Sequence, residues 1–291
     1  MARNHRRLIR SAGSEEPDTA VLGLDDSRLT DLYHSLMRAS WPALLAGVVL
    51  IFIVTNALFA IAYMLVRGVE NARPGSFGDA FFFSVQTMAT IGYGQMVPTS
   101  VTANILVTCE ALIGLLALAL ITGLLFAKFS RPSARVRFSK VAIVSNRDGV
   151  PSLQFRMANL RANRILDASA RVVFARQETT LEGEEMRRFY DLKLQRDRSS
   201  LFIYSWTAIH PITEESPISG VSKEAMEASS AEVIVSVIGL DETFAQTIHA
   251  RYSYRPRDIL WGHRFVDILE RGPDGLLSID YTHFDDVTPI A

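Results

Sequence analysis

The sequence has few of the features that support catalysis, metal binding or nucleic-acid recognition. Its one cysteine, Cys109, has no partner for an intrachain disulfide, and there is no CxxC motif for a metal. No GxGxxG motif follows a predicted strand, so a dinucleotide-binding domain is not expected. The net charge of −1 gives no general attraction to nucleic acid. No nucleophile accompanies a base, and we predict a protein that is not an enzyme.

Long apolar runs, by contrast, fill much of the chain before residue 130. Ala43–Val66 carries no charge over 24 residues. As a helix it would measure about 36 Å, more than a hydrocarbon core of about 30 Å. Ala103–Ala127 has one charged residue, Glu110. A core helix of a soluble protein could be as apolar, but two such runs predict membrane spans at about 43–66 and 103–129.

The basic residues outside these runs predict the orientation in the membrane. Six arginines precede the first run and five lysines or arginines directly follow the second, at 128–140, whereas Arg67 and Arg73 are the basic residues between them. We therefore expect a multi-pass protein of the plasma membrane, the inner membrane in a bacterium. Both termini would be cytoplasmic, with the loop between the spans outside.

The chain before the first span is expected to form one helix. The first twenty-odd residues are polar and predicted to be disordered. Apolar residues then recur at helical spacing, which predicts an amphipathic slide helix at about 28–41 that ends before Pro42. This helix could pack on a soluble domain, but its direct join to a span favours the membrane surface. Trp41 suits the membrane–water boundary, and residues 1–42 form the first predicted region.

After residue 130 the pattern changes to a period of two, which is typical of strands. Alternate residues of Gln246–Tyr254 are apolar or aromatic, and the runs 170–177 and 231–239 are rich in β-branched residues. Turn-forming stretches such as "NRDG" and "GPDG" separate the runs. A short helix is expected near Ser222–Ser229. We predict that residues 131–291 form an all-β sandwich domain.

The segment between the spans holds an aromatic half-span followed by Gly-Tyr-Gly. Phe77–Thr90 is too short to cross a membrane, which predicts a re-entrant pore helix at about 77–89 within a pore domain at 43–130. Residues 90–94 would be non-helical. Such backbone is tolerated at membrane depth only where it is buried in protein or lines a water-filled cavity.

Glycine reaches positive φ, so Gly92 and Gly94 allow successive carbonyl oxygens to turn the same way. Rows of these oxygens could replace the water around a cation, which the negative end of the preceding helix dipole also favours. Potassium channels use TVGYG in this way, and Ile91 here replaces the valine. We predict K⁺ binding by the carbonyls of Thr90, Ile91, Gly92 and Tyr93, with Gly94 ending the filter. One chain builds one wall, so a symmetric oligomer is required; in a soluble protein these residues would form a turn.

Motifs spread along the chain carry a family resemblance. They are, in order, "SWP" (40–42), "ATIGYG" (89–94), "FAKFSRP" (126–132), "RMANLR" (156–161), "WTAIHPITEESPI" (206–218), "ILWGHRF" (259–265) and "IDYTHF" (279–284). The chain resembles the inward-rectifier potassium channels, most closely their prokaryotic branch, over about Leu29–Pro289. The resemblance implies a homotetramer with a central pore and an immunoglobulin-like cytoplasmic sandwich. It implies passive K⁺ conduction, with K⁺ as the permeant ion and no cofactor.

The resemblance also implies lipid contacts and a gate in the membrane domain. Anionic phospholipids would regulate the channel, and basic residues after the second span favour such a surface, unless they mark orientation alone. The expected lipid contacts are Trp41, Lys128, Arg131, Arg135 and Arg137. Leu118, Thr122 and Phe126 share one face of the second span and would form the inner-pore gate. Ordinary helix packing is the alternative.

In the cytoplasmic domain the resemblance implies a second constriction in the loop Gly239–Thr247. Its residues would be Gly239, Phe244, Ala245 and Gln246, although relatives often have small residues at the tip. Asp167 matches an acidic position that attracts blockers, or is an ordinary surface aspartate. Leu118 stands where strong rectifiers carry an acid, which implies weak rectification. Mg²⁺, polyamines and Ba²⁺ are the candidate blockers.

Gln86 and Glu110, behind the filter, are expected to support it. Many relatives have an acid paired with a base at the positions of Gln86 and Met96, so support here must come from hydrogen bonds and packing. Glu110 should face the pore helix and bond to a Thr or Gln, because an ionisable group within a span needs a partner; a position near the outer surface is the alternative. Asn56 is expected to bond between helices.

Three other functions remain open from the sequence. A membrane-anchored β-sandwich receptor would not conduct ions and would tolerate changes in Gly-Tyr-Gly. A potassium-transporter subunit should contain four pore segments in one chain, and one is present here. A non-selective cation channel would not need both glycines.

Overall fold

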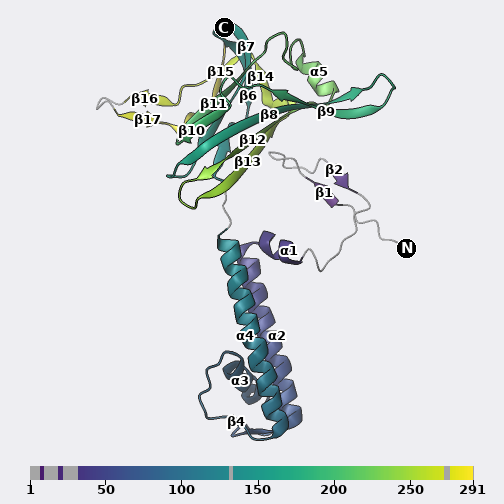
Figure 1. Cartoon of the computed structure of the whole chain (residues 1–291), viewed down its shortest axis with the longest axis vertical. Helices are drawn as coiled ribbons and strands as arrows, with labels where there is room; N and C mark the ends of the chain where they lie inside the picture. The colour runs from purple at the N-terminus through teal and green to yellow at the C-terminus, as the bar shows by residue number, and fades with distance from the viewer. Residues whose placement is uncertain (1–6, 10–18, 22–31, 131–133, 272–275, 291) are drawn as a thin grey trace. The chain divides into compact units, whose positions relative to one another are not determined.

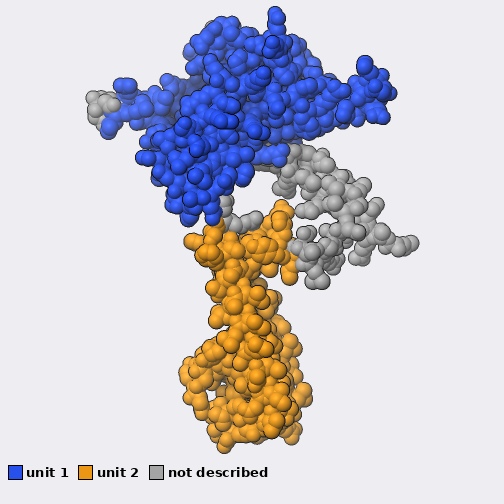
Figure 2. Space-filling model, viewed as in Figure 1, with its two compact units in different colours: residues 1–24, 132–291 blue, residues 25–131 orange. Residues whose placement is uncertain are grey.

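The computed structural model describes residues 7–9, 19–21, 32–130, 134–271 and 276–290. The chain divides into two compact units, coloured separately in Figure 2. We call residues 25–131 the membrane unit, and residues 1–24 with 132–291 the β unit. Each is described by itself.

Two long helices, α2 and α4, run side by side in the membrane unit, and the short helix α3 packs against both (Figure 1). Both long helices are long and apolar enough to span a membrane. The elements in chain order are α1 (Leu32–Arg38), α2 (Trp41–Val66), β3 (Val69–Glu70), α3 (Phe77–Met88), β4 (Val97–Pro98) and α4 (Val101–Phe129). The two-residue strands β3 and β4 pair with each other.

Serine side chains determine where three of these helices begin. The hydroxyls of Ser40, Ser76 and Ser100 accept hydrogen bonds from the backbone N–H groups of residues 43, 79 and 103. Pro42 lies in the first turn of α2, where its missing N–H costs nothing. The prediction that Pro42 ends the slide helix was therefore wrong, since Trp41 and Pro42 open α2. Residues 28–31 of the predicted helix lie outside the described residues.

The β unit is a sandwich of two five-stranded sheets. One sheet has the order β10-β8-β12-β13, with β9 also paired to β8. The other has the order β11-β7-β6-β14, with β5 also paired to β7, and its β14–β6 pair is parallel. The strands are β5 (Val136–Phe138), β6 (Ala142–Arg147), β7 (Val150–Asn159), β8 (Ile165–Thr179), β9 (Glu185–Leu192), β10 (Arg198–Phe202), β11 (Ser205–Pro211), β12 (Glu232–Asp241), β13 (Gln246–Tyr254) and β14 (Ile259–Trp261).

The β unit also contains smaller elements. They are β1 (Arg7–Ile9) paired with β2 (Thr19–Val21), α5 (Lys223–Ala228), η1 (Pro256–Asp258), β15 (His263–Phe265) paired with β18 (Val287–Pro289), β16 (Leu269–Arg271) paired with β17 (Leu277–Ile279), and η2 (Tyr281–His283). α5 lies at the predicted helix near Ser222–Ser229. The prediction of a disordered N-terminus missed the strands β1 and β2.

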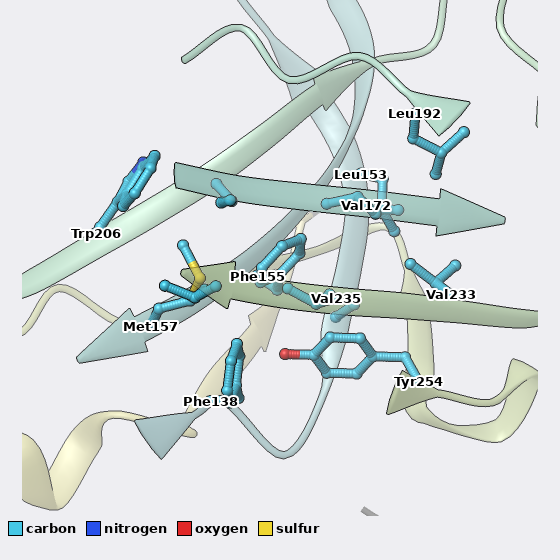
Figure 3. Packing of buried hydrophobic residues seen from close by; sticks show 14 of the residues in the cluster. Phe138, Leu153, Phe155, Met157, Val172, Leu192, Trp206, Val233, Val235 and Tyr254 are labelled. Atoms are coloured by element: carbon cyan, nitrogen blue, oxygen red, sulfur yellow. The ribbon is translucent and has the colours of Figure 1, made fainter. Parts of the chain in front are cut away.

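The two sheets bury one shared apolar core (Figure 3). Because neighbouring side chains of a strand point to opposite faces, each strand contributes alternate residues. β8 contributes Val172 and Phe174, β12 contributes Val233 and Val235, and β7 contributes Leu153, Phe155 and Met157. This packing of two sheets face to face is the sandwich architecture. The predicted fold class, a two-span α-helical unit with an all-β sandwich, is confirmed.

A buried arginine joins β7 to the C-terminal part of the β unit. Arg156 donates from Nη2 to the carbonyl of Val266 at 2.6 Å and from Nη1 to the carbonyl of Phe284 at 3.5 Å. Its guanidinium lies over the ring of Phe265, 4.6 Å from the centroid. Burial lowers the pKa of Arg156, and the negative charges of two nearby aspartates only partly offset this by raising it. The cation therefore holds segments that are distant in sequence.

Replacing this arginine by methionine should destabilise the β unit. Arg156→Met keeps much of the side-chain length but leaves two carbonyls without their donor, so we expect a loss of about 1–3 kcal/mol in the free energy of unfolding. Denaturant unfolding of the full chain in detergent, followed by near-ultraviolet circular dichroism, measures it. Arg171→Met, at an exposed position on β8, is the control and should change little. Equal effects of the two variants would contradict the role given to Arg156.

Candidate functional site

The filter segment, Thr90–Gly94, leaves the C-terminal end of α3 and is tied to it by the backbone. The N–H of Thr90 donates to the carbonyl of Thr87 at 3.1 Å, and the N–H of Ile91 donates to the carbonyl of Gln86 at 2.8 Å. Gln86, predicted to support the filter, thus contacts it through its carbonyl oxygen. Because of these bonds, a movement of the last turn of α3 would also move the start of the filter segment.

Backbone angles alternate in sign along this segment. Thr90, Gly92 and Gly94 have φ of 54°, 57° and 78°, whereas Ile91 and Tyr93 between them are not in the positive region. Alternation of this kind turns successive carbonyl oxygens toward one side. Among the described residues, no hydrogen bond reaches the carbonyls of residues 90–94. The segment therefore offers a row of free oxygen ligands.

A single chain supplies these ligands from one direction. All five residues of the filter segment are exposed within the chain. No group of three or more His, Cys, Asp or Glu side chains that could hold a metal occurs in the described parts of the chain. Any cation bound here would consequently depend on backbone carbonyls, which suit hard, weakly polarising ions better than transition metals.

Behind α3 lies a cluster of buried polar side chains from three helices: Asn56 and Tyr63 of α2, Ser84 of α3 and Glu110 of α4. Tyr63 donates to Glu110 Oε2 at 2.6 Å, and a short hydrogen bond joins Ser84 to Glu110 Oε1. Ser84 also contacts Asn56 Oδ1 at 2.9 Å. Glu110 does face α3, as expected, but the predicted Thr or Gln partner was wrong. The interhelical bond predicted for Asn56 is confirmed.

Sequence reasoning missed Ser84 and Tyr63, although a signal was present. Ser84 is the one polar residue in the aromatic stretch Phe81–Val85, and Tyr63 lies in an apolar span. A hydroxyl inside a membrane needs a hydrogen-bond partner. The hydroxyls of Ser84 and Tyr63 could therefore have been matched to Asn56 and Glu110, the polar residues already noted in the spans.

A close approach of α4 to α3 fixes the end of the short helix. A Cβ atom added to Gly114 would lie 2.6 Å from the carbonyl oxygen of Met88, the last residue of α3. Real Cβ atoms are not found this close to a backbone oxygen, so a larger residue must displace one helix. Gly114 is thus a position where the two helices require glycine.

The predicted gate residues lie on α4 and do not pack inside the chain. Leu118 is 65% exposed and Phe126 is 73% exposed, and Thr122 between them is also exposed. Their spacing puts the three on one face of the helix. Intrachain packing, the alternative reading, therefore does not account for Leu118 and Phe126.

Among the predicted lipid contacts, Lys128 has partners within the membrane unit. Its ammonium donates to the carbonyls of Met37 and Ala39 at 3.0 and 2.6 Å, at the end of α1, and lies 5.6 Å from the ring centroid of Trp41. A cation at a helix C-terminus is favourable. Trp41 is exposed.

The remaining basic residues differ in their surroundings. Arg137 donates to Asp285 at 2.7 Å and stacks on Phe284, whereas the side chain of Arg135 is exposed. Arg131 lies outside the described residues. The basic residues expected to contact lipid therefore include two, Lys128 and Arg137, with partners in the protein.

In the β unit the structure revises the predicted constriction. The turn between β12 and β13 comprises residues 242–245, so Phe244 and Ala245 lie at its tip. Gly239 and Gln246 are strand residues instead, and Gln246 pairs with Asp241. Their assignment to the loop, which the resemblance implied, was wrong, because the β12–β13 ladder continues to the pair Asp241–Gln246.

Asp241, which sequence reasoning missed, fixes this turn. The carboxylate is buried and accepts hydrogen bonds from the backbone N–H groups of Thr243 at 2.9 Å and Phe244 at 3.2 Å. Burial disfavours its charge, but these bonds, Asn163 and the charge of Arg161 outweigh it and lower the pKa of Asp241. An aspartate that caps a turn is a recognisable signal.

A bulge displaces Asp167 on the neighbouring strand. The β8–β12 register shifts between Ile238 and Leu240, and Asp167 has a φ of 45°. A Cβ on Gly239 would meet Ile165 at 2.4 Å, so glycine allows this close approach. Bulges re-aim side chains, and Asp167 is exposed.

Comparisons with known proteins place this geometry in context. Residues 136–291 match the family described as "Inward rectifier potassium channel C-terminal domain", and residues 48–131 match "Ion channel". The inward rectifier potassium channel Kirbac3.1 of Paramagnetospirillum magnetotacticum is 46% identical over 97% of this chain and 95% of its own length. The human G protein-activated inward rectifier potassium channel 3 is 34% identical over 88% of this chain and 71% of its own.

The contact at Gly114 yields a test of how α3 is held. Gly114→Ala should push the Met88 carbonyl away and destabilise the membrane unit, since overpacking costs about 1–3 kcal/mol. Thermal unfolding of the purified protein in detergent measures the change. Gly47→Ala is the matched control, because a Cβ there meets nothing within 4 Å in α2. A Gly114→Ala protein as stable as the control would show that α3 shifts freely.

Proposed function

The chain belongs to the inward rectifier potassium channel family, and from that premise we propose that it conducts K⁺ selectively down its electrochemical gradient. The observation that carries the proposal is the filter segment, whose residues Thr90, Gly92 and Gly94 have positive φ and whose carbonyls are free of hydrogen bonds in the described chain. Those oxygens would replace the water that K⁺ leaves behind. K⁺ would bind at Thr90, Ile91, Gly92 and Tyr93.

We propose that the working unit is a homotetramer. One filter segment approaches an ion from one side, so several copies around an axis are needed to surround it. The exposed apolar residues of α2 and α4 support such an assembly, because a membrane or a neighbouring copy must cover them. Both termini and the β unit would be cytoplasmic, as the basic residues predict.

Leu118, Thr122 and Phe126 would form the inner gate. Rings of apolar side chains narrow a pore and exclude water from it. The turn 242–245 with Phe244 would form a second constriction beyond the membrane, and Asp167 would attract cations weakly. Since Leu118 carries no charge, block by Mg²⁺ or polyamines would be slight and rectification weak.

We propose further that anionic phospholipids regulate opening. Arg135 is exposed. Arg131 is close to Arg135 in the sequence, and Trp41 stands at the start of the apolar helix α2. A basic residue near an anionic leaflet contributes about 1 kcal/mol of attraction. Lys128 would act mainly by holding α1, and Arg137 mainly through Asp285.

Uptake of radioactive rubidium into liposomes that contain the purified protein tests conduction. We expect uptake that barium blocks and that changes with the fraction of anionic lipid. Gly92→Ala should abolish it, because alanine disfavours positive φ by about 1–2 kcal/mol and turns a carbonyl away. Gly75→Ala is the matched control, since Gly75 also has positive φ and open space around it. Uptake unaffected by Gly92→Ala would show that the ion takes another route, and absence of barium-sensitive uptake in the parent would favour a receptor.

The gate can be tested in the same assay. Leu118→Ala and Phe126→Ala should each raise rubidium uptake severalfold, because smaller side chains widen the inner pore and admit water. Leu120→Ala, an equally exposed leucine on another face of α4, provides the comparison. If neither gate variant exceeds Leu120→Ala, the constriction lies elsewhere.

A further inference from the structure

The buried cluster behind α3 contains three contacts between oxygen atoms. They join Tyr63 to Glu110 at 2.6 Å, Ser84 to Glu110, and Ser84 to Asn56 at 2.9 Å. All four side chains are buried. Each contact needs one proton between its two oxygens, because oxygens at hydrogen-bond distance repel without one. Three protons are therefore required.

The orientation of the Asn56 amide is fixed by its other neighbours. Its Nδ2 lies 2.7 Å from the carbonyl oxygen of Phe52 and 3.4 Å from the sulfur of Met88. Both are acceptors, so the nitrogen must face them. The amide oxygen then faces Ser84, and it has no proton to give. The Ser84 hydroxyl must donate to Asn56.

This assignment uses the single proton of Ser84. Tyr63 supplies one more, for its contact with Glu110 Oε2. The two hydroxyls thus satisfy two contacts, and the contact between Ser84 and Glu110 Oε1 still lacks a proton. The carboxyl group is the one member of the cluster that can supply it.

We propose that Glu110 is a neutral carboxylic acid that donates to Ser84 and so positions α3 beneath the filter. The proton order runs from Tyr63 to Glu110 Oε2, and from Glu110 Oε1 through Ser84 to Asn56. Asn56 in turn donates to Met88, two residues before the filter segment. One part of this inference rests on the proposed function, namely that α3 carries a K⁺ filter. The proton count depends only on the contacts within the cluster.

The surroundings agree with an uncharged group. Within the described residues, no Lys, Arg or His lies within 4.0 Å of the Glu110 carboxyl group. A buried carboxylate without a cation is costly, and such groups take up a proton instead. Cys109, the neighbouring titratable residue on α4, is exposed. A neutral cluster would leave the carbonyls and the α3 dipole as the charges that K⁺ meets.

Infrared difference spectroscopy of the reconstituted protein at neutral pH tests the proposal directly. A protonated carboxyl group has a C=O stretching band that a carboxylate lacks. The spectrum of the parent minus that of Glu110→Gln should show this band, whereas Glu184→Gln, which changes an exposed glutamate, should not. Absence of the band in the first difference would overturn the proposal, whether or not the protein conducts K⁺.

One further variant, Ser84→Ala, keeps the test informative if Glu110→Gln assembles poorly. Ser84→Ala should shift the band to higher frequency, because the acid loses its acceptor; an unshifted band would refute donation to Ser84.

In the rubidium assay, Glu110→Leu should lose preference for rubidium over sodium, and Glu110→Gln should restore most of it. The glutamine amide can donate to Ser84 and accept from Tyr63 as the neutral acid does. Failure of glutamine to exceed leucine would contradict the neutral form.

Discussion

The carbonyl oxygens of residues 90–94 constrain the membrane unit more strongly than its long helices do. A backbone acceptor without a partner at membrane depth costs several kcal/mol, and in the described chain no N–H or hydroxyl reaches these five. On the proposed function, an ion would satisfy them only when several copies converge. The proposed oligomer, the positive φ of Gly92 and Gly94 and the support behind them would all meet this one requirement.

The support is supplied by elements that converge on α3. Ser76 caps its first turn, Gly114 brings α4 against its last carbonyl, and Ser84 joins its middle to α2 and α4 through Asn56 and Glu110. A helix of twelve residues is marginal alone. Its position is therefore set by tertiary contacts, and polar groups in an apolar surrounding give those contacts direction as well as strength.

Sequence reasoning succeeded where a feature repeats or is long. Two long apolar runs, a half-span before Gly-Tyr-Gly and alternation in Gln246–Tyr254 were enough for the fold class. It was less successful with partners: Glu110 was matched to Thr or Gln because spacing cannot show which hydroxyl faces it across helices. Gly239 was assigned to a loop from the family resemblance, because the bulge opposite Asp167 depends on the pairing of two strands distant in sequence and leaves no local signal.

The bond between Lys128 and the end of α1 has a mechanical consequence. One ammonium near the C-terminal end of α4 holds two carbonyls at the end of the short helix that leads into α2. The last turn of α4 cannot tilt outward without stretching these bonds or pulling α1 along with it. Within the chain the end of α4 is thus tethered to the start of α2, and force applied to α1 is delivered to α4 by a side chain rather than through the connecting loops.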